Sequence, residues 1–330
     1  MSTTAFLGAY GYGNLGDELC LIEAMQAFPA TQAHALSPDP EWTRRCVPAL
    51  AGCFKEGPEL LALAPDRIVF GGGMFGLNEA FAAWMPWMAQ AQARGAAIHI
   101  HNLGMARIKD NLHWLDARAR QVIANLASFT VRDYLSFEMV AEAGFGRLPR
   151  LTFFPEADIA AEPDLAHALL PEGVAGGRKL MGLSIICTRH MQACLQADKA
   201  RVREALAPFA DHAIVPVIST VHLNSAEEDD AAGTSGFLRD FLPDALIAAP
   251  ILLDRAHWRA DLTPRRLKGL IARCDVLVTQ RKHNAVHAIG AGTRVIGLHP
   301  IEDDSLRRTF VTLNHRLPPG SRCVGLEPAA

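Results

Sequence analysis

The sequence predicts an α/β fold made of two doubly wound, Rossmann-like domains that face a cleft. Short apolar runs rich in β-branched residues alternate with helical patterns along the chain, and this alternation is typical of a parallel sheet covered by helices. A segment rich in proline and glycine interrupts the alternation, which then resumes. The 330 residues, half of them hydrophobic, suffice for two domains of ordinary size, each with its own core.

We expect the first domain over residues 1–162 and the second over residues 179–330, joined by a linker at 163–178. Pro163, Pro171 and three nearby glycines give the linker its irregular character. The strands expected in the first domain are Thr4–Gly8, Ala33–Leu36, Arg67–Phe70, Ala97–His101, Ser128–Val131 and Leu151–Phe154. The helices expected there are Asp17–Ala27, Glu79–Arg94, Leu112–Leu126 and Tyr134–Ala143.

The second domain repeats the pattern, and its tail from Pro318 is expected to be irregular. Its expected strands are Leu180–Ile186, Ala213–Ile218, Leu246–Ala248, Asp275–Thr279 and Arg294–Leu298. Its expected helices are His190–Phe209, Ser235–Leu242, Pro264–Arg273 and Lys282–Ala291. In such sheets ligands bind at the carboxyl ends of the strands, so the loops that follow strands are the places to look for chemistry.

Composition narrows the choice of partners and compartment. The formal net charge is −3 and the basic residues are scattered, which gives no reason to expect a nucleic acid as partner. The seven cysteines form no C-x-x-C pair, and the chain starts without a basic, apolar leader; this predicts reduced thiols in a cytoplasmic protein. No apolar run reaches the length of a membrane span, so any membrane contact is expected to be peripheral.

The most informative motif is G-Y-G-N-L-G-D-E, from Gly11 to Glu18, between the first expected strand and the first helix. A strand, a glycine turn and a helix N-terminus together hold phosphate groups in many proteins, and Gly11, Gly13 and Gly16 match G-x-G-x-x-G. Asp17 and Glu18, however, put two negative charges where a pyrophosphate would bind. We therefore disfavour a nicotinamide or flavin site. These two acids either cap the helix or handle a hydroxyl group in the cleft.

Two further loops after strands suit an anion. Gly71, Gly72 and Gly73 allow a ligand close to the backbone and can present N–H groups, although they also suit a tight turn before a helix that Asn78 caps. Arg189 follows a strand of the second domain, where a guanidinium is well placed to bind a carboxylate or a phosphate.

The strongest anion signal is Arg281-Lys282-His283, which leaves a buried-looking strand and starts a helix. His283 and His287 share a helix face, but no third ligand stands at a fitting spacing. We therefore expect no metal site and assign His287 to packing.

Other charged residues have structural interpretations. The acidic run from Glu227 to Asp230 is expected to be a solvated helix start, although its place after a strand and a polar loop also suits a contact to a sugar. Arg132 and Asp133 are expected to form an interior ion pair. The sequence contains no G-x-S-x-G elbow and no Walker lysine, which argues against a hydrolase or a P-loop enzyme.

Taken together, these motifs resemble the polysaccharide pyruvyl transferase family. The resemblance rests on Gly11–Glu18, Val69-Phe70-Gly71-Gly72-Gly73, Val131-Arg132-Asp133, and Arg281-Lys282-His283 followed by Ala288, Gly292 and Val295. It covers nearly the whole chain in the expected order. It implies a fold like that of GT-B glycosyltransferases, with the acceptor bound by the first domain and the donor by the second.

The resemblance also implies a reaction and a set of site residues. A pyruvyl group passes from phosphoenolpyruvate to two hydroxyls of a sugar, in a polysaccharide or its precursor, forming a ketal and releasing phosphate. The resemblance implies that Arg281 and His283 serve the donor and the proton transfers, and that Arg189 grips the donor. From the chemistry of the residues themselves, we expect His283 and either Asp17 or Glu18 to be catalytic. We expect the donor to be bound by Arg281, Lys282, Arg189, Gly71, Gly72 and Gly73, and the acceptor by Tyr12, Asn14, Asn78 and Glu79.

Two departures from the family pattern bear on the reaction. Lys282 replaces the leucine of the usual Arg-Leu-His triplet, and Asn78 stands where an aspartate is usual, with Glu79 beside it. Two alternatives therefore stay open: a GT-B glycosyltransferase that uses a nucleotide sugar, and a non-catalytic family member that binds a sugar or an anion.

The implied partners are phosphoenolpyruvate as co-substrate and a sugar acceptor, with no further cofactor, in exopolysaccharide or cell-envelope biosynthesis. A lipid-linked oligosaccharide acceptor would bring the enzyme to the inner face of the plasma membrane. The sequence is also compatible with a homo-oligomer.

Overall fold

The computed structural model describes residues 2–72, 74–75, 79–105, 117–142, 144, 146–162, 168–171, 173–303 and 305–328. Gly73, Asn78 and part of the expected linker lie outside the described residues, as does the side chain of Glu79. Contacts divide the chain into two compact units, Met1–Tyr12 with Asp17–Pro155, and Gly13–Gly16 with Glu156–Ala330. The division thus falls after Pro155, whereas composition alone placed it at the linker.

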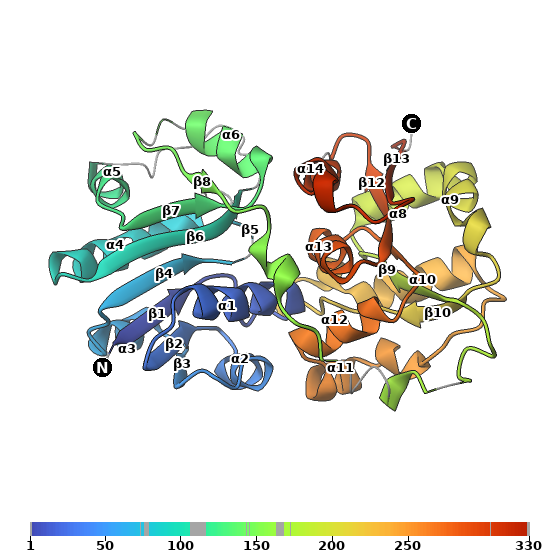
Figure 1. Ribbon diagram of the computed structural model, residues 1–330, viewed down its shortest axis with the longest axis horizontal. Coiled ribbons are helices and arrows are strands. Elements are labelled where there is room, and N and C mark those ends of the chain that lie inside the picture. The colour runs from blue at the N-terminus through green and yellow to red at the C-terminus, as the bar shows by residue number, and fades with distance from the viewer. Residues whose placement is uncertain are drawn as a thin grey trace. The chain divides into compact units, whose positions relative to one another are not determined.

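The first unit is built on a parallel sheet with the strand order β3-β2-β1-β4-β6-β7-β8, and the short β5 pairs with β6 (Figure 1). Its strands are β1 (Thr3–Leu7), β2 (Gln32–Leu36), β3 (Gly52–Phe54), β4 (Arg67–Gly71), β5 (Met74–Phe75), β6 (Ala97–Met105), β7 (Ser128–Val131) and β8 (Arg150–Leu151). Its helices are α1 (Leu15–Ala27), α2 (Pro40–Cys46), α3 (Gly57–Ala62), α4 (Glu79–Ala93), α5 (Ala117–Ala124) and α6 (Tyr134–Glu142).

The second unit has a parallel sheet with the order β10-β9-β11-β12-β13. Its strands are β9 (Leu180–Ser184), β10 (Ala213–Pro216), β11 (Val276–Thr279), β12 (Arg294–Pro300) and β13 (Arg322–Leu326). Its helices are α8 (Arg189–Ala197), α9 (Lys199–Leu206), α10 (Asp230–Phe241), α11 (Arg255–Asp261), α12 (Pro264–Ala272), α13 (Lys282–Ala291) and α14 (Ser305–Thr312). The 3₁₀ turns are η1 (Pro155–Asp158), η2 (Ala207–Phe209), η3 (Ala226–Glu228), η4 (Pro250–Leu253) and η5 (Asn314–Arg316).

Each sheet reverses its strand order at one point. In the first unit the reversal lies between β1 and β4, which pair in register as Leu7 with Phe70. In the second it lies between β9 and β11, which pair as Ser184 with Thr279. At such a switch point the connections leave in opposite directions and open a crevice outside the carboxyl ends of the strands, where ligands bind. The predicted fold of two doubly wound, Rossmann-like halves is therefore confirmed.

Each unit has its own hydrophobic core, as composition predicted. The central strands are buried on both faces, and their sequences are therefore continuous apolar runs, such as Ile68 to Phe70 in β4 and Val276 to Val278 in β11. One cluster of buried side chains joins β4 and β6 to α4 and α5, and a second joins β9, β11 and β12 to α8 and α9. Two rigid platforms of this kind can hold loop residues in fixed positions.

Some expected elements are wrong. The strand expected over Leu151–Phe154 ends at Leu151, because Phe153 and Phe154 have φ of 57° and 55°, in the left-handed region. The guanidinium of Arg132 lies over the ring of Phe154, with 5.5 Å from its central carbon to the ring centroid. The stretch Leu246–Ala248 contributes only an isolated bridge, from Ile247 to Ile214.

Two other expectations also fail in the second unit. The helix expected over His190–Phe209 is broken at Asp198, which ends α8, begins α9 and accepts a hydrogen bond from the backbone N–H of Glu327 at 3.2 Å. The tail after Pro318 is not irregular, because Arg322–Leu326 forms β13 and pairs in parallel with β12. A strand at the edge of a sheet is short and weakly patterned, which explains why its sequence gave little sign of it.

The packing of α13 shows why His287 is structural, as predicted. A Cβ on Gly290 would lie 2.0 Å from the carbonyl oxygen of Ala157, so η1 lies directly against this helix. Lys268 of α12 donates to the carbonyl oxygens of Ala157 and Ile159, at 2.6 and 2.5 Å. His287 is buried, and burial together with the nearby Lys268 lowers its pKa to about 3. His287 is therefore neutral at physiological pH.

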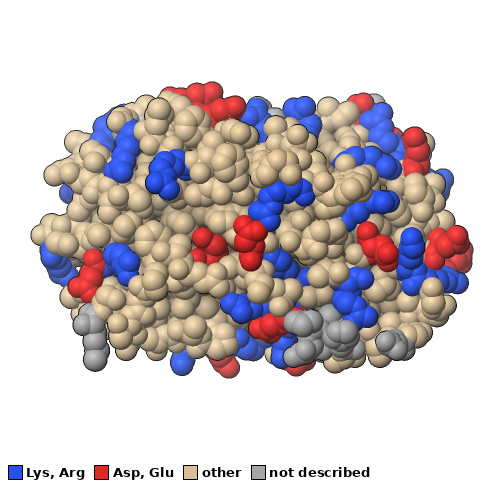
Figure 2. Space-filling view, in the orientation of Figure 1, with Lys and Arg blue, Asp and Glu red and all other residues tan. Residues whose placement is uncertain are grey.

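The surface carries mixed charges. Figure 2 shows basic and acidic side chains interspersed among uncharged residues on the face drawn. Arg132 and Asp133 instead form the interior ion pair that the sequence predicted, with Nε and Oδ2 3.9 Å apart. Among the described residues, no helix has the length and apolarity needed to cross a bilayer.

Candidate active site

At the first switch point, Tyr10 joins the loops that follow β1 and β4. Its side chain is fully buried and its hydroxyl donates to the carbonyl oxygen of Gly71 at 2.5 Å. A Cβ on Gly72 would lie 2.8 Å from the tyrosine ring, and Gly72 has a φ of 77°, so only glycine suits this approach. The two glycines thus hold the loop against Tyr10. Their role in binding the donor stays a prediction.

Glu18 braces the opening glycine turn from inside the first unit. Its Oε1 accepts hydrogen bonds from the backbone N–H of Gly11 at 2.6 Å and from the hydroxyl of Thr43 at 3.3 Å. Burial raises the pKa of Glu18 to about 8, although the Gly11 hydrogen bond opposes the shift. Both contacts shape the turn, and Asp17, its neighbour, is also buried.

The middle of the opening motif belongs to the second unit. Asn14 forms an antiparallel bridge with Thr220, and the backbone N–H of Leu15 donates to the carbonyl oxygen of Ser219 at 2.9 Å. The side-chain oxygen of Asn14 accepts from the N–H of Gly16 at 3.0 Å, which fixes the turn into α1. The loop after β10 therefore holds this part of the motif.

Gly16 brings the motif against the predicted catalytic histidine. A Cβ at this position would lie 2.4 Å from Nδ1 of His283, which is closer than atoms of this kind approach. His283 is the second residue of α13, directly after the carboxyl end of β11. Asn14, Gly16 and His283 are thus brought together within one unit, although they are far apart in the sequence.

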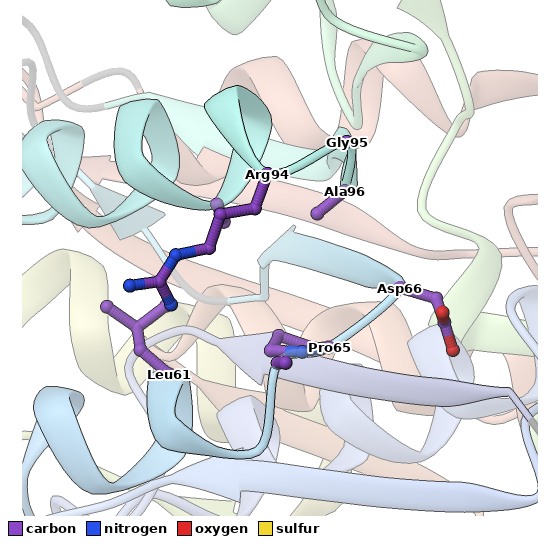
Figure 3. A pocket seen from close by; sticks show the side chains of 8 residues that line it. Leu61, Pro65, Asp66, Arg94, Gly95 and Ala96 are labelled. Atoms are coloured by element: carbon purple, nitrogen blue, oxygen red, sulfur yellow. The ribbon is translucent and has the colours of Figure 1, made fainter.

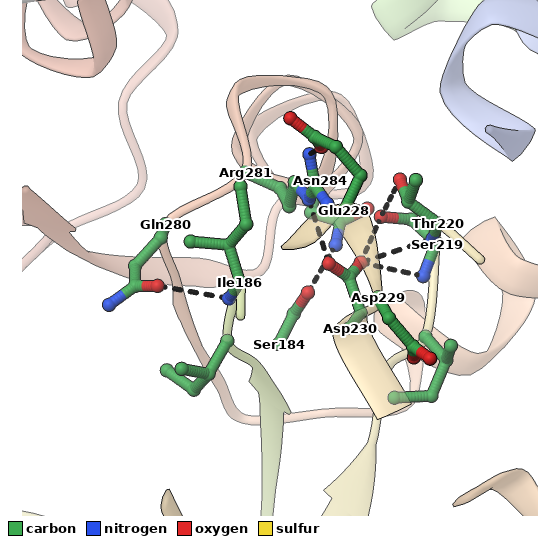
Figure 4. Close-up of polar contacts among 12 residues, drawn as sticks. Ser184, Ile186, Ser219, Thr220, Glu228, Asp229, Asp230, Gln280, Arg281 and Asn284 are labelled. Carbon is green, nitrogen blue, oxygen red and sulfur yellow. Dashed lines mark hydrogen bonds and ion pairs between the residues drawn. The ribbon is translucent and has the colours of Figure 1, made fainter. Parts of the chain in front are cut away.

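Arg281 lies at the second switch point and is held by two carboxylates (Figure 4). Its Nε donates to Oδ1 of Asp230 at 2.8 Å, and its Nη1 is ion-paired with Glu228. The arginine side chain is 14% exposed and that of Asp230 is fully buried. Burial opposes the charged form of Arg281, yet the two carboxylates raise its pKa above the ordinary value. The positive charge of Arg281, which was expected from the sequence to bind the donor substrate, is therefore balanced by carboxylates of the protein.

Asp230 also binds the loop after β10. Its Oδ2 accepts hydrogen bonds from the hydroxyl of Ser219 at 2.8 Å, from the N–H of Ser219 at 3.2 Å and from that of Thr220 at 3.1 Å. Burial raises the pKa of Asp230, and Arg281 offsets part of that rise. Hydrogen bonds to a carboxylate of this kind favour its ionised form.

Neighbouring polar contacts tie the switch-point strands together. The amide of Asn284 donates to the hydroxyl of Ser184 at 2.8 Å, which connects α13 to the end of β9. Gln280 accepts from the backbone N–H of Ile186 at 3.0 Å. These bonds fix the loop that carries Arg281 (Figure 4).

The other predicted donor residues lie on adjacent elements. Lys282 is the first residue of α13, and Arg189 is the first residue of α8, which Thr188 caps by accepting from the N–H of Met191 at 3.4 Å. Arg189 is exposed. Since β9 and β11 are neighbours, both cations follow strands that flank the same switch point.

The sequence interpretation missed the partners of Arg281. The acidic run was expected to be solvated, but Asp229 and Asp230 are 6% and 0% exposed, so that expectation is wrong for both. The physical reason is that Asp230 neutralises the largely buried Arg281, while Asp229 caps α10 by accepting from the N–H of Ala231 at 2.9 Å. The sequence signal that could have indicated this burial was the pair of adjacent acids at the start of a helix rich in small residues.

A cavity elsewhere in the first unit is not a candidate for the site. This cavity of about 160 Å³ is lined by residues of the turns before β4 and β6, including Asp66 and Arg94 (Figure 3). These turns lie at the amino ends of the parallel strands, opposite the edge at which such sheets bind ligands.

The geometry defines an α/β protein with a Rossmann-like sheet in each unit and, in the second, an arginine-centred site at the switch point. The sequence model of one family, polysaccharide pyruvyl transferase, matches residues 14–299, and the chain belongs to that family.

Two solved structures show the same fold. The UDP-GlcNAc 2-epimerase of Methanocaldococcus jannaschii is 10% identical with a TM-score of 0.53, over 98% of this chain and 89% of that one. The UDP-GlcNAc 2-epimerase of Neisseria meningitidis, bound to UDP-GlcNAc, is 10% identical with a TM-score of 0.50, over 93% of this chain and 85% of that one. No curated protein matches. At these identities the likeness shows only the fold, which is of the GT-B type.

The buried carboxyl of Glu18 predicts a pH dependence of stability. Its pKa is about 8 when folded and about 4.5 ordinarily, so the stability that it contributes is complete below 4.5 and is lost as the pH rises through 8. Because of this group, the unfolding free energy of the wild type should fall by about 3 kcal/mol between pH 5 and pH 7.5. Glu18→Gln should abolish that fall, which urea unfolding at the two pH values measures. Glu59→Gln, at an exposed site, is the control. The same pH dependence in Glu18→Gln and the wild type would contradict the assignment.

The close approach of Gly16 to His283 predicts a cost for any side chain there. Gly16→Ala should lower the unfolding free energy by about 1–3 kcal/mol, because the new methyl group must displace the histidine ring. Gly236→Ala is the matched control, since a Cβ there meets only Nη2 of Arg239 at 3.7 Å; it should be neutral or stabilising by up to about 1 kcal/mol. Equal stability of Gly16→Ala and the wild type would show that the contact is not tight.

Proposed function

We propose that the chain transfers a pyruvyl group from phosphoenolpyruvate to two hydroxyls of a sugar in a polysaccharide or its precursor, forming a ketal. The observation that supports this most is the position of Arg281-Lys282-His283. The three residues begin a helix at the carboxyl end of β11, beside the switch point, in a chain that belongs to the pyruvyl transferase family.

The site suits the charge of the donor. Phosphoenolpyruvate carries a carboxylate and a phosphate, and the N-terminus of a helix such as α13 attracts anions. Lys282 and Arg189 supply cations on the flanking loops. Nη2 of Arg281 has no hydrogen-bond partner among the described residues, so one nitrogen of the fork is left for the donor. The glycine loop at Gly71 and Gly72 is a further donor-binding candidate.

The first step, addition of a sugar hydroxyl to phosphoenolpyruvate, needs two proton transfers. A proton goes to the methylene carbon, and the first sugar hydroxyl loses its proton as its oxygen bonds to the adjacent carbon. In the second step, the second hydroxyl displaces inorganic phosphate from that carbon, and its proton leaves with the phosphate. We assign one of the two transfers of the first step to His283, because an imidazole is suited to exchange protons near neutral pH. We assign the other to Asp17, which directly follows Gly16, with Glu18 bracing the turn.

The acceptor side rests on the opening motif. Tyr12 and Asn14 are the described candidates for contacts to the sugar, and Asn78 and Glu79 complete the set proposed from the sequence. On the basis of the family, we further propose a role in exopolysaccharide or cell-envelope biosynthesis in the cytoplasm, with a free or lipid-linked acceptor. Phosphoenolpyruvate is the co-substrate, and the proposal requires no cofactor.

A second candidate function is glycosyl transfer from a nucleotide sugar. The two structures that share the fold are UDP-GlcNAc 2-epimerases, one of them bound to UDP-GlcNAc, which makes a nucleotide sugar the alternative ligand to test. Its donor carries a base and a ribose that phosphoenolpyruvate lacks, so ligand binding separates the two candidates.

A thermal-shift panel tests the proposal. Phosphoenolpyruvate should raise the melting temperature selectively over UDP-GlcNAc, free nucleotides and NAD, because ligands that bind the folded state stabilise it. His283→Ala should keep this shift and lower turnover by about 10²- to 10⁴-fold, the usual contribution of a positioned acid or base. Stabilisation by UDP-GlcNAc alone would favour the glycosyltransferase, and full turnover in His283→Ala would exclude the role of that histidine.

A further inference from the structure

We infer that Asp230 is a positioning residue: it orients Arg281 for an anionic donor and ties that arginine to the loop that holds the opening motif. The identity of the donor rests on the proposed function, whereas the orienting role rests on the geometry alone. Asp230 lies in the acidic run that opens α10, and it is not among the residues that the family resemblance implies.

Every described contact of the Asp230 carboxylate is with a hydrogen-bond donor. Oδ1 accepts from Nε of Arg281, and Oδ2 accepts from Ser219 and Thr220. The residue is fully buried, so water does not compete for these bonds. A carboxylate that accepts on both sides fixes the plane of the guanidinium as well as its charge.

The same geometry explains why an amide cannot replace this carboxylate. An asparagine has one accepting oxygen and one donating nitrogen. If its oxygen faced Arg281, its NH₂ group would meet the N–H groups of Ser219 and Thr220. If it were flipped, the NH₂ group would meet Nε of Arg281. Either orientation places two donors against each other, so one side of the network must open.

Glu228 has a different role at the same arginine. Its side chain is 36% exposed, compared with 0% for Asp230, and it pairs with Nη1 of Arg281 rather than with Nε. A glutamine there can still accept from Nη1 through its oxygen. Glu228 therefore contributes charge balance, while Asp230 sets the orientation and leaves Nη2 as the remaining nitrogen of the fork.

Asp230 also connects the arginine to the segment beside His283. Ser219 and Thr220, which it binds, pair with Leu15 and Asn14 of the opening motif. The next residue of that motif, Gly16, lies against the ring of His283. The buried carboxylate of Asp230 thus sets the position of Arg281 and of the segment that packs on His283. Small displacements of such groups are costly for catalysis.

The test is a double-mutant cycle on phosphoenolpyruvate binding, measured by isothermal titration calorimetry on the full chain. Asp230→Asn should weaken binding about tenfold in the wild-type background and less than about twofold in Arg281→Lys, because its effect passes through the guanidinium. Glu228→Gln should weaken binding less than Asp230→Asn. Asp229→Asn, which keeps the cap on α10, is the matched control and should bind within about twofold of the wild type. Equal losses from Asp230→Asn in both backgrounds would overturn the positioning role.

A second measurement separates this inference from the proposed function. In ¹⁵N spectra, the Nε–H of Arg281, identified by its loss in Arg281→Lys, should exchange slowly with solvent in the wild type and in Asp229→Asn. In Asp230→Asn it should exchange at least about tenfold faster, since its acceptor is lost. A fast-exchanging signal in the wild type would overturn the positioning role without reference to any donor. A slow signal in a protein that does not bind phosphoenolpyruvate would retain that role and reject the proposed donor.

Discussion

The second unit depends on the neutralisation of one largely buried arginine. Arg281 follows the central strand β11 at the switch point, and an unpaired guanidinium there would be strongly destabilising. Asp230 and Glu228 provide the opposite charges. The backbone N–H groups that complete the shell of Asp230 come from the loop after β10, and that loop pairs with the opening motif. The ion pair between Arg281 and Asp230 thereby fixes several segments that are far apart in the sequence.

Close backbone approach is the second constraint, and glycine satisfies it. Gly16 lies against His283, Gly72 against Tyr10, and Gly290 against the carbonyl of Ala157. At each position a methyl group would meet another atom at less than 3 Å. In the opening motif, Gly16 therefore serves the packing of the second unit, whatever ligand the motif binds.

The fold and part of the site could be predicted from the sequence, because alternating strands and helices are local patterns. The buried strands β4 and β11 and the helix that starts after Arg281 are examples. The partnership of Arg281 with Asp230 could not be predicted, because it joins residues 51 positions apart and an acidic run is usually solvated. The left-handed conformations of Phe153 and Phe154 and the edge strand β13 were missed because tertiary contacts, not propensities, determine them.

Product analysis tests the central claim, pyruvyl transfer at the arginine-centred site, most directly. The protein would be incubated with phosphoenolpyruvate and a library of free and lipid-linked oligosaccharides, with mass spectrometry of the sugars and an assay for inorganic phosphate. Pyruvyl transfer predicts that one acceptor gains the mass of a pyruvyl ketal in equal amount to the phosphate released, and that Arg281→Lys diminishes both together. Sugar products formed only when a nucleotide sugar is supplied, with no consumption of phosphoenolpyruvate, would contradict it.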